Sequence, residues 1–70
     1  MGVTYKLIEL VGTSPQSFAE AAKSAVAEAA KTVKNMDWFQ VVEQRGRIKD
    51  GKVVEFQVTI KVGFRVEHEK

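Results

Sequence analysis

The sequence predicts an α+β fold with the element order β-α-β-β. Three observations support this prediction. Residues 3–11 are rich in β-branched and aliphatic side chains, residues 15–34 repeat apolar side chains at helical spacing, and residues 52–67 alternate apolar and polar side chains. The last segment and a preceding strand at 38–48 flank an Asp-Gly pair, which indicates a tight hairpin turn.

The first expected strand, residues 3–11, alternates imperfectly. Lys6 and Glu9 fall on opposite faces of it, so we expect a strand that is partly covered on both sides. The four residues that follow, Gly12 to Pro15, predict a break before the helix.

The helix is expected from about residue 15 to 34, and two serines could cap it. Ser14 precedes Pro15, which suits a first helical position, while Ser17 has Glu20 at the spacing of a capping box. The apolar stripe of the helix is mostly alanine, which allows close approach to a sheet but gives limited hydrophobic burial. Its expected members are Phe18, Ala22, Ala25, Ala29, Val33 and Met36.

The hairpin makes strands 38–48 and 52–67 antiparallel, and the simplest sheet places the last strand in the middle. At about 3.3 Å per residue that strand spans roughly 50 Å. A compact domain of this size has a radius of gyration of only about 11 Å. We therefore expect a three-stranded antiparallel sheet that curls around the helix or extends onto a neighbouring subunit. Gly46 and Gly63 are the expected places for a bulge or a close backbone approach.

Length and composition indicate one small domain, residues 1–70, with a marginal core of its own. The chain has no Cys, which excludes disulfides and thiolate metal sites, and its one histidine, His68, lies near the C-terminal end. Oligomerisation is the remaining way to stabilise so small a core. We expect self-association.

Charge and hydropathy limit the partners and the location. The formal net charge of +2, with both signs interspersed, does not favour nucleic acid. No apolar run approaches the ~20 residues of a membrane span, and no signal peptide is recognisable. These features and the lack of Cys predict a cytoplasmic protein without membrane partners.

No catalytic constellation is visible, so we do not expect an enzyme. The sequence contains no Cys nucleophile, no Ser-His-acid set and no phosphate-binding Gly-rich loop, and its carboxylates lack metal-ligand spacing.

Trp38 is the main candidate binding residue, because the hairpin already has an apolar face of Val and Phe. It is either a core or interface aromatic or a platform on which a planar ligand stacks. Gln57, on the polar face of the last strand, is either a surface residue or an amide that hydrogen-bonds a pyrimidine-like ring. Arg45, Arg47 and Arg65 are solvated or ion-paired cations, or one of them contacts a phosphate.

The expected register separates these candidates. A two-residue turn places Gln57 opposite Gln44, and a bulge at Gly46 would place it opposite Glu43 instead. Either register leaves roughly 16–20 Å between Gln57 and Trp38 along the strand. A site that uses both residue types is therefore expected between subunits.

Several short motifs of the chain are each weak alone but specific in combination. The motifs are Val11-Gly12-Thr13-Ser14, Asp37-Trp38-Phe39, Arg45-Gly46, Phe56-Gln57-Val58 and Val62-Gly63-Phe64-Arg65. In their order and spacing they resemble bacterial dodecins, and the resemblance extends from Tyr5 to Glu67.

The resemblance implies a βαββ subunit in a hollow homododecamer that stores flavin and shields it from light. It implies FMN as the usual ligand, with riboflavin or FAD as alternatives, stacked in pairs between symmetry-related copies of Trp38. It also implies that Gln57 hydrogen-bonds the pyrimidine end of the ring, and that Arg45 and Arg65 help to place the flavin or its phosphate. Some family members also bind coenzyme A, to which we assign no residues.

Two other classes of function remain open on the residues. One is a structural self-assembling shell with Trp38 buried in a subunit contact. The other is a small module that binds single-stranded nucleic acid through Trp38, Arg45 and Arg47, although the low charge and the lack of a second exposed aromatic argue against it.

Overall fold

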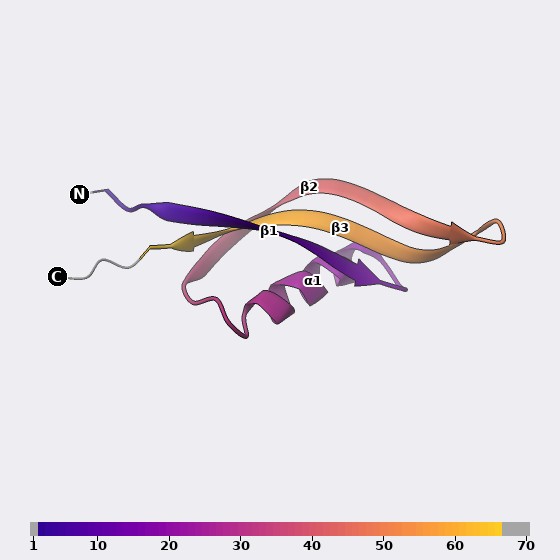
Figure 1. Cartoon of the computed structure of the whole chain (residues 1–70), viewed down its shortest axis with the longest axis horizontal. Helices are drawn as coiled ribbons and strands as arrows, with labels where there is room; N and C mark the ends of the chain where they lie inside the picture. The colour runs from indigo at the N-terminus through magenta and orange to yellow at the C-terminus, as the bar shows by residue number, and fades with distance from the viewer. Residues whose placement is uncertain (1, 67–70) are drawn as a thin grey trace.

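A computed structural model describes residues 2–66 and contains one helix and three strands (Figure 1). The elements are β1 (Tyr5–Ser14), α1 (Phe18–Ala29), β2 (Met36–Lys49) and β3 (Lys52–Arg65). The strands form one antiparallel sheet in the order β1-β3-β2, with β3 in the middle. The predicted βαββ fold is confirmed. His68 lies outside the described residues, as does residue 67, the expected end of the last strand.

Strand β1 continues through the segment that was expected to break it. Gly12 pairs with Val58 of the central strand, so it is a strand residue. A Cβ atom at position 12 would lie 2.8 Å from the Cβ of Ala25 and would collide with the carbonyl oxygen of Ala21. Glycine is therefore needed here because α1 crosses directly over this point of β1.

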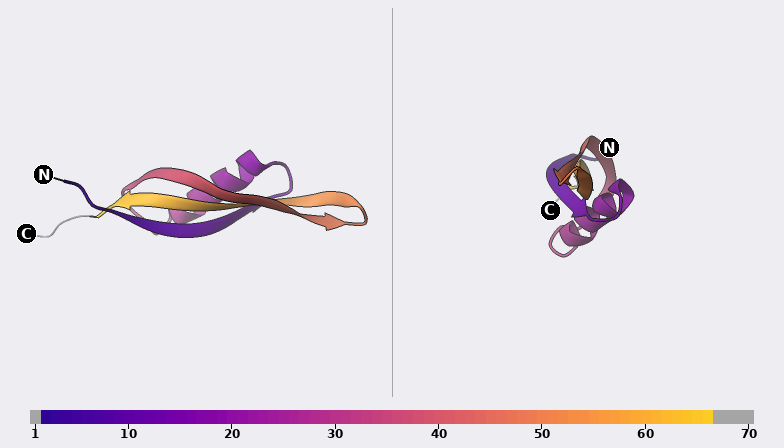
Figure 2. Two further views of the ribbon diagram at one scale, coloured as in Figure 1. Left: turned by 90° about the horizontal axis from the view of Figure 1, so that it is seen from above. Right: turned by 90° about the vertical axis from the view of Figure 1, so that its right-hand side faces the viewer.

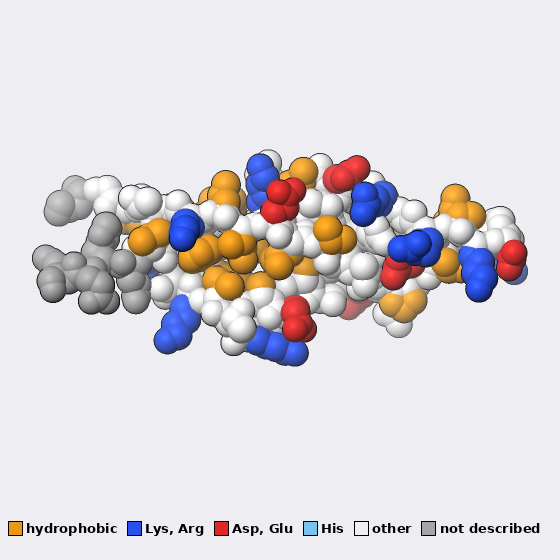
Figure 3. All heavy atoms as spheres, viewed as in Figure 1, with side chains coloured by type: hydrophobic (Ala, Val, Ile, Leu, Met, Phe, Trp, Pro, Cys, Tyr) orange, Lys and Arg blue, Asp and Glu red, His pale blue; other side chains and the backbone are white. Residues whose placement is uncertain are grey.

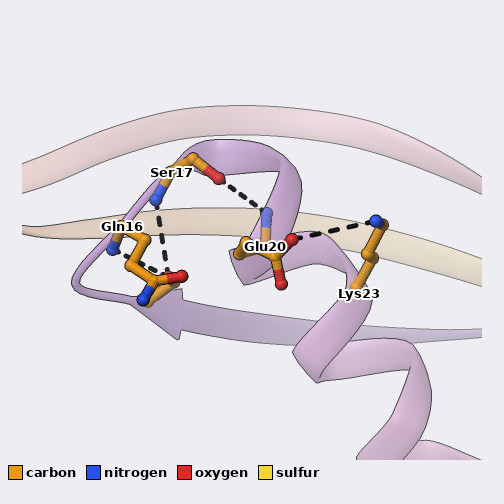
Figure 4. A network of polar contacts seen from close by, with 5 residues as sticks. Gln16, Ser17, Glu20 and Lys23 are labelled. Atoms are coloured by element: carbon orange, nitrogen blue, oxygen red, sulfur yellow. Dashed lines mark hydrogen bonds and ion pairs between the residues drawn. The ribbon is translucent and has the colours of Figure 1, made fainter.

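Ser17 caps the helix, so Ser14 is not its N-cap (Figure 4). The hydroxyl oxygen of Ser17 accepts a hydrogen bond of 3.0 Å from the backbone N–H of Glu20, which is one of the two bonds of a capping box. Ser14 remains in β1, where its oxygen accepts from the backbone N–H groups of Gln16 at 2.9 Å and Ser17 at 3.4 Å. The expected start of the helix at residue 15 is wrong for this reason.

The helix also ends earlier than expected, at Ala29. The backbone N–H groups of Thr32 and Val33 both reach the carbonyl of Ala29, and Asn35 has a left-handed φ of 66°. Asparagine tolerates this conformation, which turns the chain toward β2. Val33 and Met36 consequently do not belong to the helical stripe.

The core lies between α1 and the two strands β1 and β3. Its fully buried side chains include Ala21, which the predicted stripe omitted, and Ile60, both 0% exposed. The other buried apolar residues are Ala22, Ala25, Ala29, Val58 and Val62. Small alanines on the helix facing branched residues on the sheet explain why the two layers approach closely.

The hairpin gives the chain its elongated shape of 57 × 20 × 13 Å. Asp50 and Gly51 have φ values of 54° and 75°, as the predicted Asp-Gly turn requires. The sheet twists along its length, and the tip of the hairpin projects well beyond α1 (Figure 2). In a single chain the outer part of β2 and β3 is therefore left without a covering layer.

Candidate functional site

All four predicted site residues lie on the face of the sheet opposite α1, which we call the open face. Gln57 and Arg65 alternate along β3 with the buried Val58, Ile60 and Val62. Trp38 pairs with Gly63, and Arg45 pairs with Gln57, so both β2 residues share this face. The structure arranges the four side chains in two separate groups.

The first group surrounds Trp38 and contains Gly63, Tyr5 and Arg65; we call it the tryptophan cluster. The indole contacts the backbone of Gly63 so closely that a Cβ there would lie 2.9 Å from Cδ2 and would overlap the six-membered ring. Trp38 nevertheless remains 44% exposed. Its ring rests on the sheet and still presents surface to a ligand or to another subunit.

Tyr5 contacts the indole from β1, the edge strand on the opposite side of β3. Its ring centroid lies 6.4 Å from that of Trp38, with the two planes inclined by 58°. The hydroxyl of Tyr5 donates a 2.9 Å hydrogen bond to Oδ2 of Asp37, and this bond raises the pKa of Tyr5. Because Tyr5 pairs with Arg65 across the strands, a cation lies at the same end of the open face.

The second group, the glutamine cluster, contains Gln57, Arg45, Glu55 and Arg47. Arg45 Nε donates to Gln57 Oε1 at 2.7 Å, and Gln57 Nε2 donates to Glu55 Oε1 at 2.9 Å. The same carboxylate oxygen accepts from Arg47 Nε at 3.2 Å. The hydrogen bonds from Gln57 and Arg47 lower the pKa of Glu55, so its carboxylate form is favoured.

The pairing of Gln57 differs from both expected registers. Its partner is Arg45, whereas Gln44 pairs with Val58 and Glu43 with Thr59. The register shifts between Arg47 and Ile48, between Val41 and Glu43, and between Met36 and Trp38, so no bulge occurs at Gly46 itself. The two-residue hairpin rule assumes a continuous register, so it could not predict the shift between Arg47 and Ile48 near the turn.

The two clusters are far apart within one chain. Gln57 and Gly63, the partner of Trp38, are six positions apart on β3, which corresponds to roughly 20 Å. The structure thus brings Trp38 near Arg65 and brings Gln57 near Arg45, but it does not bring the two groups together. A planar ligand that touches both Trp38 and Gln57 would need two subunits.

Sequence reasoning missed Glu55 and Tyr5 as members of these clusters. The period-two pattern of β3 already placed Glu55 on the face of Gln57, so that signal was available. Tyr5 could not be assigned because its neighbours depend on the register between β1 and β3.

A second uncovered surface lies on the helix side of the sheet, between α1 and β2. It is a groove of about 660 Å³ with mostly apolar walls, including Val26, Phe39 and Val41. No residue of β2 is buried, and Phe39 and Val41 are 51% and 44% exposed. Figure 3 shows the other side of the molecule, with α1 behind the sheet, and hydrophobic side chains are exposed there too, between charged ones. So much apolar exposure fits a chain that associates with others.

Within residues 2–66, no set of three or more His, Cys, Asp or Glu side chains is arranged to hold a metal ion. The one helix in this range is too short to cross a membrane.

Comparison with known proteins gives matches over nearly the whole chain. The family model described as Dodecin matches residues 4–67. The chain is 49% identical over 67 residues to a dodecin of Thermus thermophilus, covering 96% of this chain and 97% of the relative. It is 31% identical over 62 residues to a Mycobacterium tuberculosis protein named calcium dodecin, covering 89% of this chain and 87% of that protein.

Solved structures agree with these matches. A T. thermophilus structure superposes with a TM-score of 0.92 at 47% identity, covering 97% of this chain and 100% of the other. The dodecin of Streptomyces coelicolor gives a TM-score of 0.91 at 45% identity and 96% coverage of both chains. Structures of T. thermophilus dodecin have also been solved with the substitutions R45A, R65A and W38F.

Proposed function

The chain belongs to the dodecin family, and from this premise we propose that it binds and stores flavin, with FMN as the ligand, in a homododecamer. The observation that carries the proposal is the position and the exposure of the Trp38 side chain. Its indole lies over Gly63, is supported by Tyr5 and keeps 44% of its surface exposed. A large, supported aromatic with a free surface suits stacking on a planar ring.

The separation of the two clusters supports a shared pocket. Trp38 stacks on the isoalloxazine, Gln57 hydrogen-bonds its pyrimidine edge, and the two residues come from different subunits. Arg65 lies in the tryptophan cluster and is exposed, so it is free to contact the ribityl phosphate. The site is complete only after assembly, which agrees with the uncovered apolar surface of β2.

The solved variants of T. thermophilus dodecin give circumstantial support. Their three substitutions, W38F, R45A and R65A, carry residue types and numbers that coincide with Trp38, Arg45 and Arg65 here. This coincidence supports the choice of these residues for the flavin site. The name of the M. tuberculosis relative adds calcium as a ligand of that protein, and we propose no calcium site in this chain.

Stacking also accounts for a protective role. An indole in contact with an excited flavin quenches it by electron transfer, and a sandwich between two tryptophans excludes water and oxygen from the ring faces. We propose no catalytic turnover for this single domain of residues 1–70. A cytoplasmic location and the binding of coenzyme A, riboflavin or FAD stay predictions.

The two alternative functions differ in what they require of these side chains. A structural shell would bury Trp38 in a subunit contact and leave the purified protein without flavin. A nucleic-acid module would require free arginines, but Arg45 donates to Gln57 and Arg47 pairs with Glu55. An oligonucleotide shift that weakens with salt would nevertheless favour the nucleic-acid module.

Titration of FMN into the purified protein tests the proposal. We expect quenching of flavin fluorescence at low micromolar protein, and at least about tenfold weaker binding by Trp38→Ala. Trp38→Phe should bind with intermediate affinity because a smaller ring remains. Phe39→Leu is the matched control, since Phe39 is the adjacent exposed aromatic on the other face. Equal binding by Trp38→Ala and the parent, with the same assembly in sedimentation, would refute stacking.

A further inference from the structure

The orientation of the Gln57 amide is set by groups on either side of it. Its oxygen faces Arg45 Nε at 2.7 Å, and its nitrogen faces Glu55 Oε1 at 2.9 Å. Arginine can only donate hydrogen bonds, and a carboxylate can only accept them. A flipped amide would place donor against donor and acceptor against acceptor, so a single orientation is favoured.

Glu55 is itself fixed by a second partner. Arg47 Nε lies 3.2 Å from the oxygen that accepts from Gln57, and the Glu55 side chain is 32% exposed against 69% for Arg47. Arg45 pairs directly with Gln57, and Arg47 pairs directly with Glu55, across β2 and β3. The cluster is therefore a continuous chain of charge-assisted hydrogen bonds from one arginine to the other.

This orientation limits what Gln57 can offer to a ligand. After its two internal bonds, the amide retains one N–H donor and one acceptor lone pair, each in a defined place. A ligand edge must then present an acceptor to the nitrogen and a donor to the oxygen. The C=O and N3–H groups on the pyrimidine edge of a flavin form such a pair.

We propose that Glu55 is a positioning residue that, with Arg45, fixes the polarity of the Gln57 amide and so makes the site select rings with adjacent N–H and C=O groups. This inference rests on the proposed flavin function and deepens it. It also gives Arg45 a role in orienting Gln57 instead of in binding phosphate. Glu55 acts through Gln57 and does not itself touch the ligand.

Substitution Glu55→Gln tests the proposal, because an amide at position 55 both donates and accepts hydrogen bonds, so that only Arg45 still favours one orientation of Gln57. Affinities for riboflavin, FMN and N3-methyl riboflavin are measured by fluorescence quenching. In the parent, methylation of N3 removes the donor and should weaken binding by roughly tenfold, the worth of one hydrogen bond in a polar site. In Glu55→Gln, binding of riboflavin and FMN should weaken together, and the discrimination against the methylated ring should decrease.

Two further variants provide a control for Glu55→Gln and a test of the role of Arg45. Glu43→Gln makes the same chemical change on β2, opposite Thr59, and should leave all three affinities unchanged. Arg45→Ala should weaken riboflavin and FMN equally if Arg45 orients Gln57. A loss of affinity for FMN alone would instead show that Arg45 contacts the phosphate, and it would overturn this part of the proposal. Undiminished discrimination in Glu55→Gln, equal to that of the parent, would overturn the role of Glu55.

A measurement without flavin separates this inference from the proposed function. In protein labelled with ¹⁵N-glutamine, the side-chain amide signals of Gln57 should lie apart from those of the exposed Gln16 and Gln40. Glu55→Gln should move them toward the exposed positions. Unmoved signals would refute the positioning role. A parent that binds no flavin but shows this movement would refute only the proposed function.

Discussion

The indole of Trp38 occupies the space that a side chain at position 63 would need. A Cβ on Gly63 would overlap the six-membered ring and lie 2.9 Å from Cδ2. The two residues are cross-strand partners on β2 and β3. The position of the proposed ligand platform therefore depends on the absence of a side chain on the central strand.

Substitution Gly63→Ala should displace the indole from the sheet. We expect about 1–3 kcal/mol of destabilisation, as for overpacking, and a loss of FMN affinity of roughly tenfold or more. Chemical denaturation and FMN titration measure the two effects. Gly2→Ala is the control, because nothing lies within 4 Å of a Cβ at that position. Unchanged FMN affinity in Gly63→Ala would show that the contact does not position the platform.

The hydrogen bond from Tyr5 to Asp37 should make stability depend on pH in the alkaline range. Asp37 raises the pKa of Tyr5 in the folded state above its ordinary value of 10.0. The folded protein thus holds this proton more tightly than the unfolded chain, and the contribution is complete below pH 10 and lost as pH rises through the folded pKa. Urea denaturation of the parent and Tyr5→Phe should show a difference at pH 7 that decreases as pH rises above 10. A difference that does not change with pH would mean that the ionisation of the Tyr5 hydroxyl does not affect stability, and no difference at any pH would mean that Tyr5 acts through the packing of its ring alone.

Gly12 should be as sensitive to substitution as Gly63, for a different reason. Gly12→Ala would push a methyl group against the carbonyl oxygen of Ala21 and the Cβ of Ala25, where α1 crosses β1. Backbone must shift to relieve this collision, so we expect a loss of at least about 1–3 kcal/mol in the free energy of unfolding. Thr13→Ala, on the adjacent exposed position, should change stability little. Equal stability of both variants would mean that α1 can move away from β1 at low cost.

The uncovered apolar surface of β2 predicts that assembly stabilises the fold. Sedimentation of the parent should show a dodecamer at micromolar concentration. Val41→Lys places a charge in the groove between α1 and β2 and should shift the protein to smaller species. Val3→Lys, at a more exposed residue before β1, is the control and should assemble normally. A stable monomeric parent would contradict both the assembly and the shared flavin site.

The sequence alone determined the elements and their order. Period-two alternation, the Asp50-Gly51 turn and the Ser17–Glu20 capping box are local patterns, and each acts within a few residues of the chain. The same alternation placed Gln57, Gly63 and Arg65 on one face of β3, and the residues of the resemblance indicated the family. Local rules could not choose between Ser14 and Ser17 as the cap, because that choice depends on the pairing of Ser14 with Phe56 in the sheet.

Only the tertiary structure decided which side chains meet. The register shift between Arg47 and Ile48 sets Gln57 opposite Arg45, and the shift between Val41 and Glu43 returns the strands to the register in which Trp38 lies opposite Gly63. A one-residue slip would have changed every pair. The contact of Tyr5 with Trp38 likewise depends on β1 and β2 being held on opposite sides of β3. Such pairings join residues that are distant in sequence, and their energies depend on the whole sheet, so no local pattern encodes them.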